Sequence, residues 1–208
     1  MGKELKLAVS TVTFLFIASL GITAQGLRET SADEIAASGT FDGQLYTNRS
    51  LGLTILAPGG WSFYPYSRNQ ALVAANRSGS RDRSAANTQV LFQSTPSKLS
   101  GGESSALFSS GLEKLGKMQT AEQYATANRD MLLTQPGIAV ARNIYEAKLG
   151  GLTFSGFEIT GKAKDLAYRQ VYLVTVRKGV AIFFVETFYD NRNTFAVEAS
   201  LKTLRFGK

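Results

Sequence analysis

The sequence predicts a single α+β domain in which an antiparallel β-sheet is flanked by helices. Two-residue turns at Gly150-Gly151 and Lys178-Gly179 separate runs rich in β-branched and aromatic residues, which is the pattern of β-hairpins. A capped helical segment begins at Thr120, and a second helical pattern follows Asp190. Helices that stand between groups of hairpins are typical of α+β folds.

The first residues have the three-part layout of a secretory signal. Two lysines precede an apolar run from Leu7 to Ile22, and small residues suited to signal peptidase follow it. We expect residues 1–24 to be removed by cleavage after Ala24, with Gly26 as the other cleavage point, and the protein to be exported to the periplasm or the medium. The alternative is an uncleaved N-terminal membrane anchor. The run disfavours an anchor because it is shorter than about 20 residues and carries hydroxyl groups.

The segment after the signal is polar and rich in small residues. We expect residues 25–40 to form a flexible leader, although a turn of helix within Glu29–Ala37 is the alternative. The single folded domain is then expected to span residues 41–208. No linker and no internal repeat divides it.

The first half of the domain carries strand signals. Alternating apolar residues and the positions of Pro and Gly predict strands at Leu51–Ala57, Trp61–Tyr66, Ala71–Ala75 and Thr88–Ser94. Leu107–Leu115 is interpreted as a short helix. A longer helix follows, because Thr120 and Gln123 match a capping box and Tyr124, Ala127 and Met131 recur at helical spacing.

The second half is a run of hairpins followed by a helix. We expect strands at Asn143–Leu149, Leu152–Thr160, Tyr168–Arg177 and Val180–Tyr189. Val180–Val185 is almost wholly apolar, so this strand is predicted to be central in the sheet. Asp190 or Asn191 is expected to cap the terminal helix, whose apolar residues are Phe195, Val197, Ala199, Leu201 and Leu204.

The composition excludes several classes of chemistry. The 208 residues include no Cys and no His, so disulfides, thiolate nucleophiles, Cys/His zinc sites and imidazole general bases are ruled out. We therefore predict no cofactor, no metal and no catalytic residue. The net charge is +7, which favours anionic partners but also simply aids solubility.

Two stretches resemble the PsbP-like and Mog1-like domains. The first runs from Tyr46-Thr47-Asn48 through Leu51–Ile55 to Pro58–Trp61, and the second is Phe195–Phe206, which contains the sequence ASLKTLRF. The resemblance implies an α/β/α sandwich, a central antiparallel sheet covered by helices. These domains occur in photosystem accessory proteins, a nuclear-transport factor and envelope proteins, so the resemblance implies no particular activity and no catalytic residue.

An aromatic cluster lies at Trp61, Phe63, Tyr64 and Tyr66. Aromatic faces stack on sugar rings, so the outer members, Tyr64 and Tyr66, are a candidate binding surface. The competing interpretation, which we favour, is that Trp61 and Phe63 point into the core while the tyrosines face outward, as alternation along a strand predicts.

Two groups of basic residues are candidate anion sites. Arg68, Arg77, Arg81 and Arg83 lie in or beside a polar loop and suit phosphate, sulfate or lipid headgroups, although a solvated loop is the simpler interpretation. No aromatic residue interleaves the last three, so we expect no nucleic-acid partner. A second patch is suggested near the hairpin ends, where charge also guards edges against aggregation. Its members are Lys162, Lys164, Arg169, Arg177 and Lys178.

The acidic residues are scattered, and none has metal-site spacing. Glu158 and Glu186 lie on predicted strands, and facing each other across the sheet they would make a glycosidase-like carboxylate pair.

Three functions are therefore carried forward. The first is an exported, non-enzymatic accessory module that engages a protein partner or a membrane-associated assembly. The second is a binder of an anionic or sugar polymer through the Arg68–Arg83 region or the outer aromatics, and the third is a carboxylate-based hydrolase. The partners considered beside a protein or an envelope assembly are anionic lipid and polysaccharide.

Overall fold

The computed structural model describes residues 30–64, 88–96, 106–163 and 166–207. The described strands are β1 (Gly39–Asp42), β2 (Leu45–Asn48), β3 (Leu53–Leu56), β4 (Trp61–Phe63), β5 (Thr88–Pro96), β6 (Ala106–Lys114), β7 (Ala139–Leu149), β8 (Leu152–Ala163), β9 (Leu166–Arg177), β10 (Val180–Phe188) and β11 (Arg205–Phe206). The described helices are α1 (Ala32–Ala37), α3 (Ala121–Leu133) and α4 (Thr194–Lys202).

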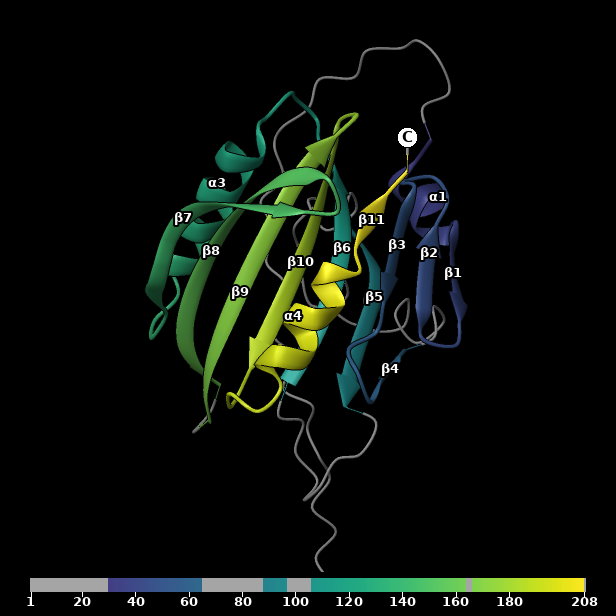
Figure 1. Cartoon of the computed structure of the whole chain (residues 1–208). Helices are drawn as coiled ribbons and strands as arrows, with labels where there is room; N and C mark the ends of the chain where they lie inside the picture. Colours follow the sequence, from purple (N-terminus) through teal and green to yellow (C-terminus); the bar gives the residue numbers. More distant parts are fainter. Residues whose placement is uncertain (1–29, 65–87, 97–105, 164–165, 208) are drawn as a thin grey trace, which may run out of the picture.

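The strands form two antiparallel sheets, so the domain is α+β as predicted. The large sheet has the order β4-β5-β6-β10-β9-β8-β7, and the small sheet has the order β1-β2-β3-β11. Helix α3 lies behind the large sheet, and α4 and the small sheet lie on its other side (Figure 1). The small sheet is an addition to the expected sandwich, because we predicted helices alone as the covering layers.

Strand β10 is the middle strand of the large sheet, and every residue of it is buried, which confirms the prediction of a central strand. Its side chains alternate between two cores. Ile182 and Phe184 pack toward α1, α4 and the small sheet, whereas Phe183 and Val185 pack toward α3. The predicted hairpin turns are also present. Lys178 and Gly179 both have positive φ angles, 50° and 75°, as a two-residue turn that matches the strand twist requires.

The expected flexible leader at residues 25–40 is wrong for its described part. The Ser31 hydroxyl accepts a hydrogen bond from the Glu34 amide at 3.1 Å, and the Glu34 carboxylate accepts one from the Ser31 amide at 2.8 Å. This capping box begins α1, whose Ile35 and Ala36 are buried in the core. Folded structure therefore begins ahead of Phe41, because a single helical turn gains stability by burying its apolar face.

The short helix expected at Leu107–Leu115 is also wrong, because this segment is strand β6. It pairs with β5 on one side and with β10 on the other. Ser109, Ser110 and Gly111 weaken the strand signal, yet each fits its place. The two hydroxyls donate to carbonyl oxygens of β10, and a Cβ on Gly111 would lie 2.4 Å from the Phe183 ring.

The helices at Thr120 and after Asp190 are present, with corrections in detail. Both capping-box hydrogen bonds between Thr120 and Gln123 form, but Ala127 is exposed rather than buried. In α4 the N-cap is Asn193, and Phe195 is 76% exposed, so it does not join the core with Val197 and Leu201. Among the described residues no helix combines the length and the apolar character needed to cross a bilayer.

Candidate anion-binding pocket

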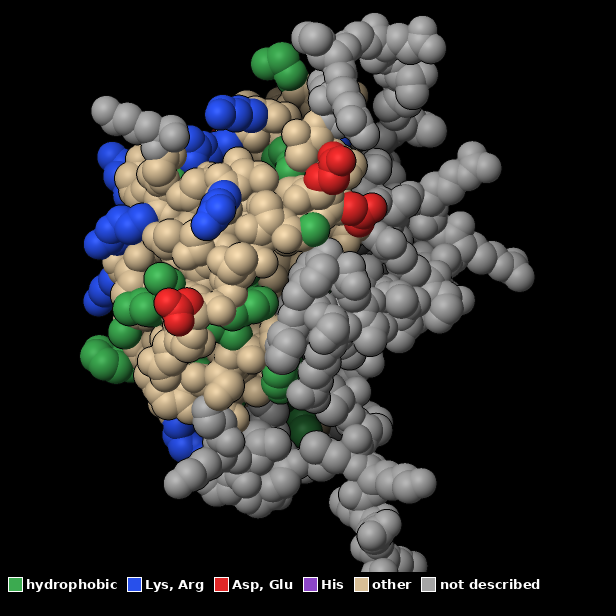
Figure 2. Space-filling model, turned by 90° about the vertical axis from the view of Figure 1, so that its right-hand side faces the viewer, with side chains coloured by type: hydrophobic (Ala, Val, Ile, Leu, Met, Phe, Trp, Pro, Cys, Tyr) green, Lys and Arg blue, Asp and Glu red, His purple; other side chains and the backbone are tan. Residues whose placement is uncertain are grey.

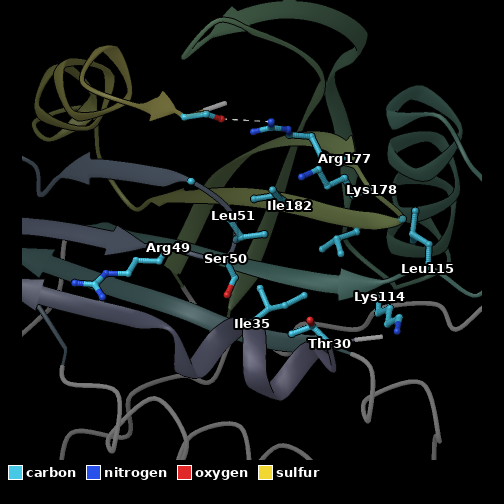
Figure 3. Close-up of a pocket in the computed structure, with 14 residues that line it drawn as sticks. Thr30, Ile35, Arg49, Ser50, Leu51, Lys114, Leu115, Arg177, Lys178 and Ile182 are labelled. Carbon is cyan, nitrogen blue, oxygen red and sulfur yellow. Dashed lines mark hydrogen bonds between the residues drawn. The ribbon is translucent and has the colours of Figure 1, made fainter. Parts of the chain in front are cut away.

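A pocket of about 530 Å³ lies at the end of the large sheet where β9 turns into β10. Its walls come from α1, the β2–β3 turn, the end of β6, the β9–β10 hairpin and the residue after β11 (Figure 3). The lining residues are Thr30, Ile35, Arg49, Ser50, Leu51, Gly52, Lys114, Leu115, Arg177, Lys178, Gly179, Val180, Ile182 and Gly207. The volume is within the range of small-ligand sites, about 300–1,000 Å³.

One wall is fixed by the β9–β10 turn. Arg177 pairs with Val180 across the hairpin, so the tight turn places Arg177 and Lys178 side by side at the rim. The amide of Leu115 donates to the Gly179 carbonyl at 2.8 Å, which fastens the end of β6 to the same turn. Both connections are backbone features, so the rim is rigid where its cations are attached.

The opposite wall is the β2–β3 turn. Gly52 has a φ of 64°, and a Cβ there would lie 3.2 Å from the backbone nitrogen of Gly207. The Gly207 amide donates to the Gly52 carbonyl at 2.7 Å. The buried Asn48 side chain ties this turn to α1, because its amide donates to the Ile35 carbonyl at 2.7 Å and its oxygen accepts from the Leu51 amide at 3.0 Å.

The pocket has an apolar middle and a cationic rim. Ile35, Leu51 and Ile182 lie in the middle, Arg49 lies on one side, and Arg177 and Lys178 lie along another (Figure 3). Lys114 completes the cationic residues. None of the lining residues, all of which belong to the described part of the chain, is acidic. Such a site favours a ligand that carries negative charge beside an apolar part.

Arg177 is the pocket cation whose hydrogen-bonding capacity is most clearly unused. Its Nη2 donates to the Gly207 carbonyl at 3.5 Å, and its guanidinium lies 5.5 Å from the centre of the Phe206 ring. Its Nη1 is buried and makes no hydrogen bond to any described group. No carboxylate of the described ranges forms an ion pair with it. A buried cationic donor without an acceptor is costly, so an anion that enters the pocket gains by supplying one.

The predicted second basic patch is wrong as a single surface. Arg169 and Arg177 lie at opposite ends of β9, because Arg169 pairs with Phe188 and Arg177 pairs with Val180. Lys162 lies at the Arg169 end, on β8, and Lys164 lies outside the described residues. Only Arg177 and Lys178 contribute to the pocket. Their partners there, Arg49 and Lys114, come from distant segments and were not singled out by the sequence.

The two candidate carboxylates lie on one face of the large sheet but do not face each other directly. Glu158 pairs with Val171, and Val171 pairs with Glu186, so β9 separates the two glutamates by two strand spacings, about 9.5 Å. Glu158 lies 3.5 Å from Arg169 and 3.8 Å from Arg142. Neither glutamate lines the pocket. Within the described ranges no group of three or more acidic residues is placed to hold a metal ion.

Glu186 is nevertheless an unusual residue. It is 4% exposed, although its backbone is paired with the strands on both sides. Burial raises its pKa to about 8, while the nearby Arg169 lowers the pKa and Glu198 and Glu158 raise it further. At this end of the sheet Glu158 is paired with Arg142 and Arg169, beside the buried Glu186, whereas the residues that line the pocket include no acid.

The aromatic prediction is confirmed for the core. Trp61 is 3% exposed, and Phe63 packs against Phe41 and Phe92. Tyr64 is half-buried and its hydroxyl lies 2.6 Å from the Thr95 hydroxyl, so it belongs to the β4–β5 edge and not to the pocket. The remaining predicted binding residues lie outside the described ranges. These are Tyr66, Arg68, Arg77, Arg81 and Arg83.

Comparison with known proteins identifies the fold. No family model and no curated protein matches the sequence. Cyanobacterial PsbP (CyanoP) from Synechocystis has a similar structure with a TM-score of 0.50 and 13% identity, covering 89% of this chain and 98% of CyanoP. LpqN of Mycobacterium tuberculosis, described as involved in cell envelope biogenesis, has a TM-score of 0.51 and 11% identity, covering 86% of this chain and 99% of LpqN.

A third similar structure, from Bacteroides thetaiotaomicron, has a TM-score of 0.45 and 11% identity, and this chain, aligned over 81% of its own length, spans half of that one. The two full-length matches show that the chain has the PsbP-like, Mog1-like fold, as its sequence resemblance implied. Identities this low establish the fold and not the activity.

Proposed function

We propose that this chain is an exported, non-enzymatic accessory module of the cell envelope that binds an anionic group in its basic pocket. The observation that carries the proposal is the pocket itself, with four cationic residues, an apolar middle and no acidic residue among the residues that line it. The absence of His and Cys from the sequence supports binding rather than acid–base or thiol chemistry. The envelope role of LpqN and the PsbP identity of CyanoP support an accessory role.

The other two functions have less support. A polymer site at Arg68–Arg83 falls outside the described residues. A carboxylate hydrolase needs its acid and base in one cleft, yet Glu158 is engaged by Arg142 and Arg169, and the pocket contains neither glutamate. The protein partner or membrane-associated assembly expected from the sequence remains part of the proposal.

Calorimetric titration of the full chain with inorganic phosphate, in a neutral detergent and at constant ionic strength, tests the anion site. The double variant R177Q/K178Q should bind phosphate about tenfold more weakly, because it removes charge-assisted donors from the rim. Lys162→Gln is the matched control, since it removes one exposed cation at the other end of the sheet. Equal affinities in all three proteins would contradict the proposal.

Export is tested by fractionation, which should place the full chain in the envelope or the medium.

A further inference from the structure

Thr30, directly ahead of α1, lines the pocket, so the pocket lies at the end of the domain nearest to the N-terminal apolar run. We infer that the pocket faces the membrane and takes the phosphate of an anionic phospholipid headgroup. The inference rests on the proposed function, which it deepens by naming the ligand class.

The first argument is the position of Thr30. It is the first described residue, and it lines the pocket. The apolar run of the sequence ends at Ile22, eight residues before Thr30. Eight residues span at most about 29 Å when fully extended. Where the run stays attached as a membrane anchor, the alternative to cleavage, it therefore holds this end of the domain within about 29 Å of the lipid surface.

The second argument is the distribution of charge between the two ends of the sheet. At the far end the arginines are paired with acids, Arg169 with Glu158 and Arg192 with Asp190. At the pocket end Arg177 has no such partner among the described residues. Figure 2 shows Lys and Arg side chains mainly in the upper left of the face in view, with acidic side chains to their right and below them. A cation that no described acid neutralises, such as Arg177, is attracted to an anionic surface.

The third argument is the apolar middle of the pocket. Leu51 and Leu115 are half-buried there, beside the buried Ile35 and Ile182. A headgroup phosphate at the rim places its glycerol and first acyl carbons against these side chains. Free phosphate has no apolar part and uses the rim alone, so the lipid makes fuller use of the site.

The experiment measures which end of the domain approaches the bilayer. The sequence contains no Cys, so Ser50→Cys at the pocket and Asn191→Cys beyond β10 each give a single labelling position. The full chain carrying an environment-sensitive dye at one position is reconstituted with vesicles that contain a spin-labelled quencher lipid. The vesicles are phosphatidylcholine alone or phosphatidylcholine with phosphatidylglycerol.

We expect strong quenching at position 50 and weak quenching at position 191 when phosphatidylglycerol is present. The phosphatidylglycerol-dependent part should be lost in R177Q/K178Q and at about 1 M salt, where screening acts over roughly 3 Å. Lys162→Gln should retain it. Equal quenching at the two positions, or quenching that does not depend on phosphatidylglycerol or on Arg177 and Lys178, would overturn the inference.

The phosphate titration separates the two proposals. If the pocket binds inorganic phosphate but position 50 shows no dependence on phosphatidylglycerol, the lipid is excluded and the anion site stands. Its ligand then belongs to an acidic protein or polymer. If phosphate binding is also unaffected by R177Q/K178Q, both proposals fail.

Discussion

Two arginines of strand β9 have similar local surroundings but opposite electrostatic ones. Arg169 and Arg177 lie on the same face of the sheet, each 5.4 to 5.5 Å from the centre of a phenylalanine ring and each with a buried nitrogen that has no described hydrogen-bond partner. Arg169 is neighboured by Glu158 and Glu186, whereas Arg177 has no described acidic neighbour within ion-pair distance. Arg169 is therefore engaged in the ion pairs of the fold, whereas Arg177 is available to a ligand.

The largest expected effect concerns Glu186, the buried carboxylate at the end of the sheet where Arg169 pairs with Glu158. Its pKa is raised from 4.5 to about 8, so the folded state holds a proton that the unfolded state releases above pH 4.5. The free energy of unfolding should therefore be highest below pH 4.5 and should fall until about pH 8. Glu186→Gln removes this loss and should stabilise the protein by about 4 kcal/mol at pH 8, with a gain that vanishes near pH 4.

Urea unfolding at several pH values measures this effect. Glu146→Gln, at an exposed position on β7, is the control for the loss of one negative charge. Glu113 is buried with the Tyr124 hydroxyl at 2.5 Å, and burial raises its pKa to about 7, but it contributes equally to both proteins. A Glu186→Gln variant that is less stable than the wild type at pH 8 would show that Arg169 compensates the carboxylate fully.

The next effect distinguishes the two arginines directly. Arg169→Met leaves Glu158 with the more distant Arg142 as its cation, and we expect a loss of about 1–2 kcal/mol at pH 7, below the cost of a fully buried pair because Arg169 is partly exposed. Arg177→Met should change the free energy of unfolding by less than about 0.5 kcal/mol. Urea unfolding of both variants checks this ordering. Equal losses would mean that the two arginines are both structural.

The smallest effect is expected when an acidic residue is introduced among the cations of the pocket. Ser50→Asp introduces a carboxylate into the lining, where its negative charge repels an incoming anion. We expect phosphate affinity to fall and the free energy of unfolding to rise by at most about 1 kcal/mol at low salt. Ser50→Asn is the isosteric control. Unchanged phosphate affinity in Ser50→Asp would place the anion elsewhere.

Local patterns predicted the hairpins, the central strand β10 and the helix at Thr120, because each depends on residues close in sequence. They failed where contacts between residues that are distant in the sequence decide the secondary structure. Gly111 belongs to a strand because Phe183 of the adjacent strand fills the space above it. The Ser31–Glu34 capping box is present in the sequence, but α1 is so short that its burial in the core decides whether it forms.

The pocket could not be predicted for the same reason. Arg49, Lys114 and Arg177 are far apart in the chain and meet only through the order of the strands. Arg177 was grouped with Arg169 because both lie on one predicted strand, and the sequence does not show which cation a carboxylate of another strand will neutralise.

The position of β11 has a consequence for how the protein folds. β11 pairs with β3, and the amide of Leu56 is held by the Thr203 hydroxyl, 147 residues later. Contacts of such long range slow folding, since a large loop must close before they form. Until β11 is in place, β3 is left as an unpaired edge of the small sheet. A chain that crosses a membrane from its N-terminus could not form these contacts until nearly all of it had crossed. It would therefore remain incompletely folded, and able to be translocated, up to that point.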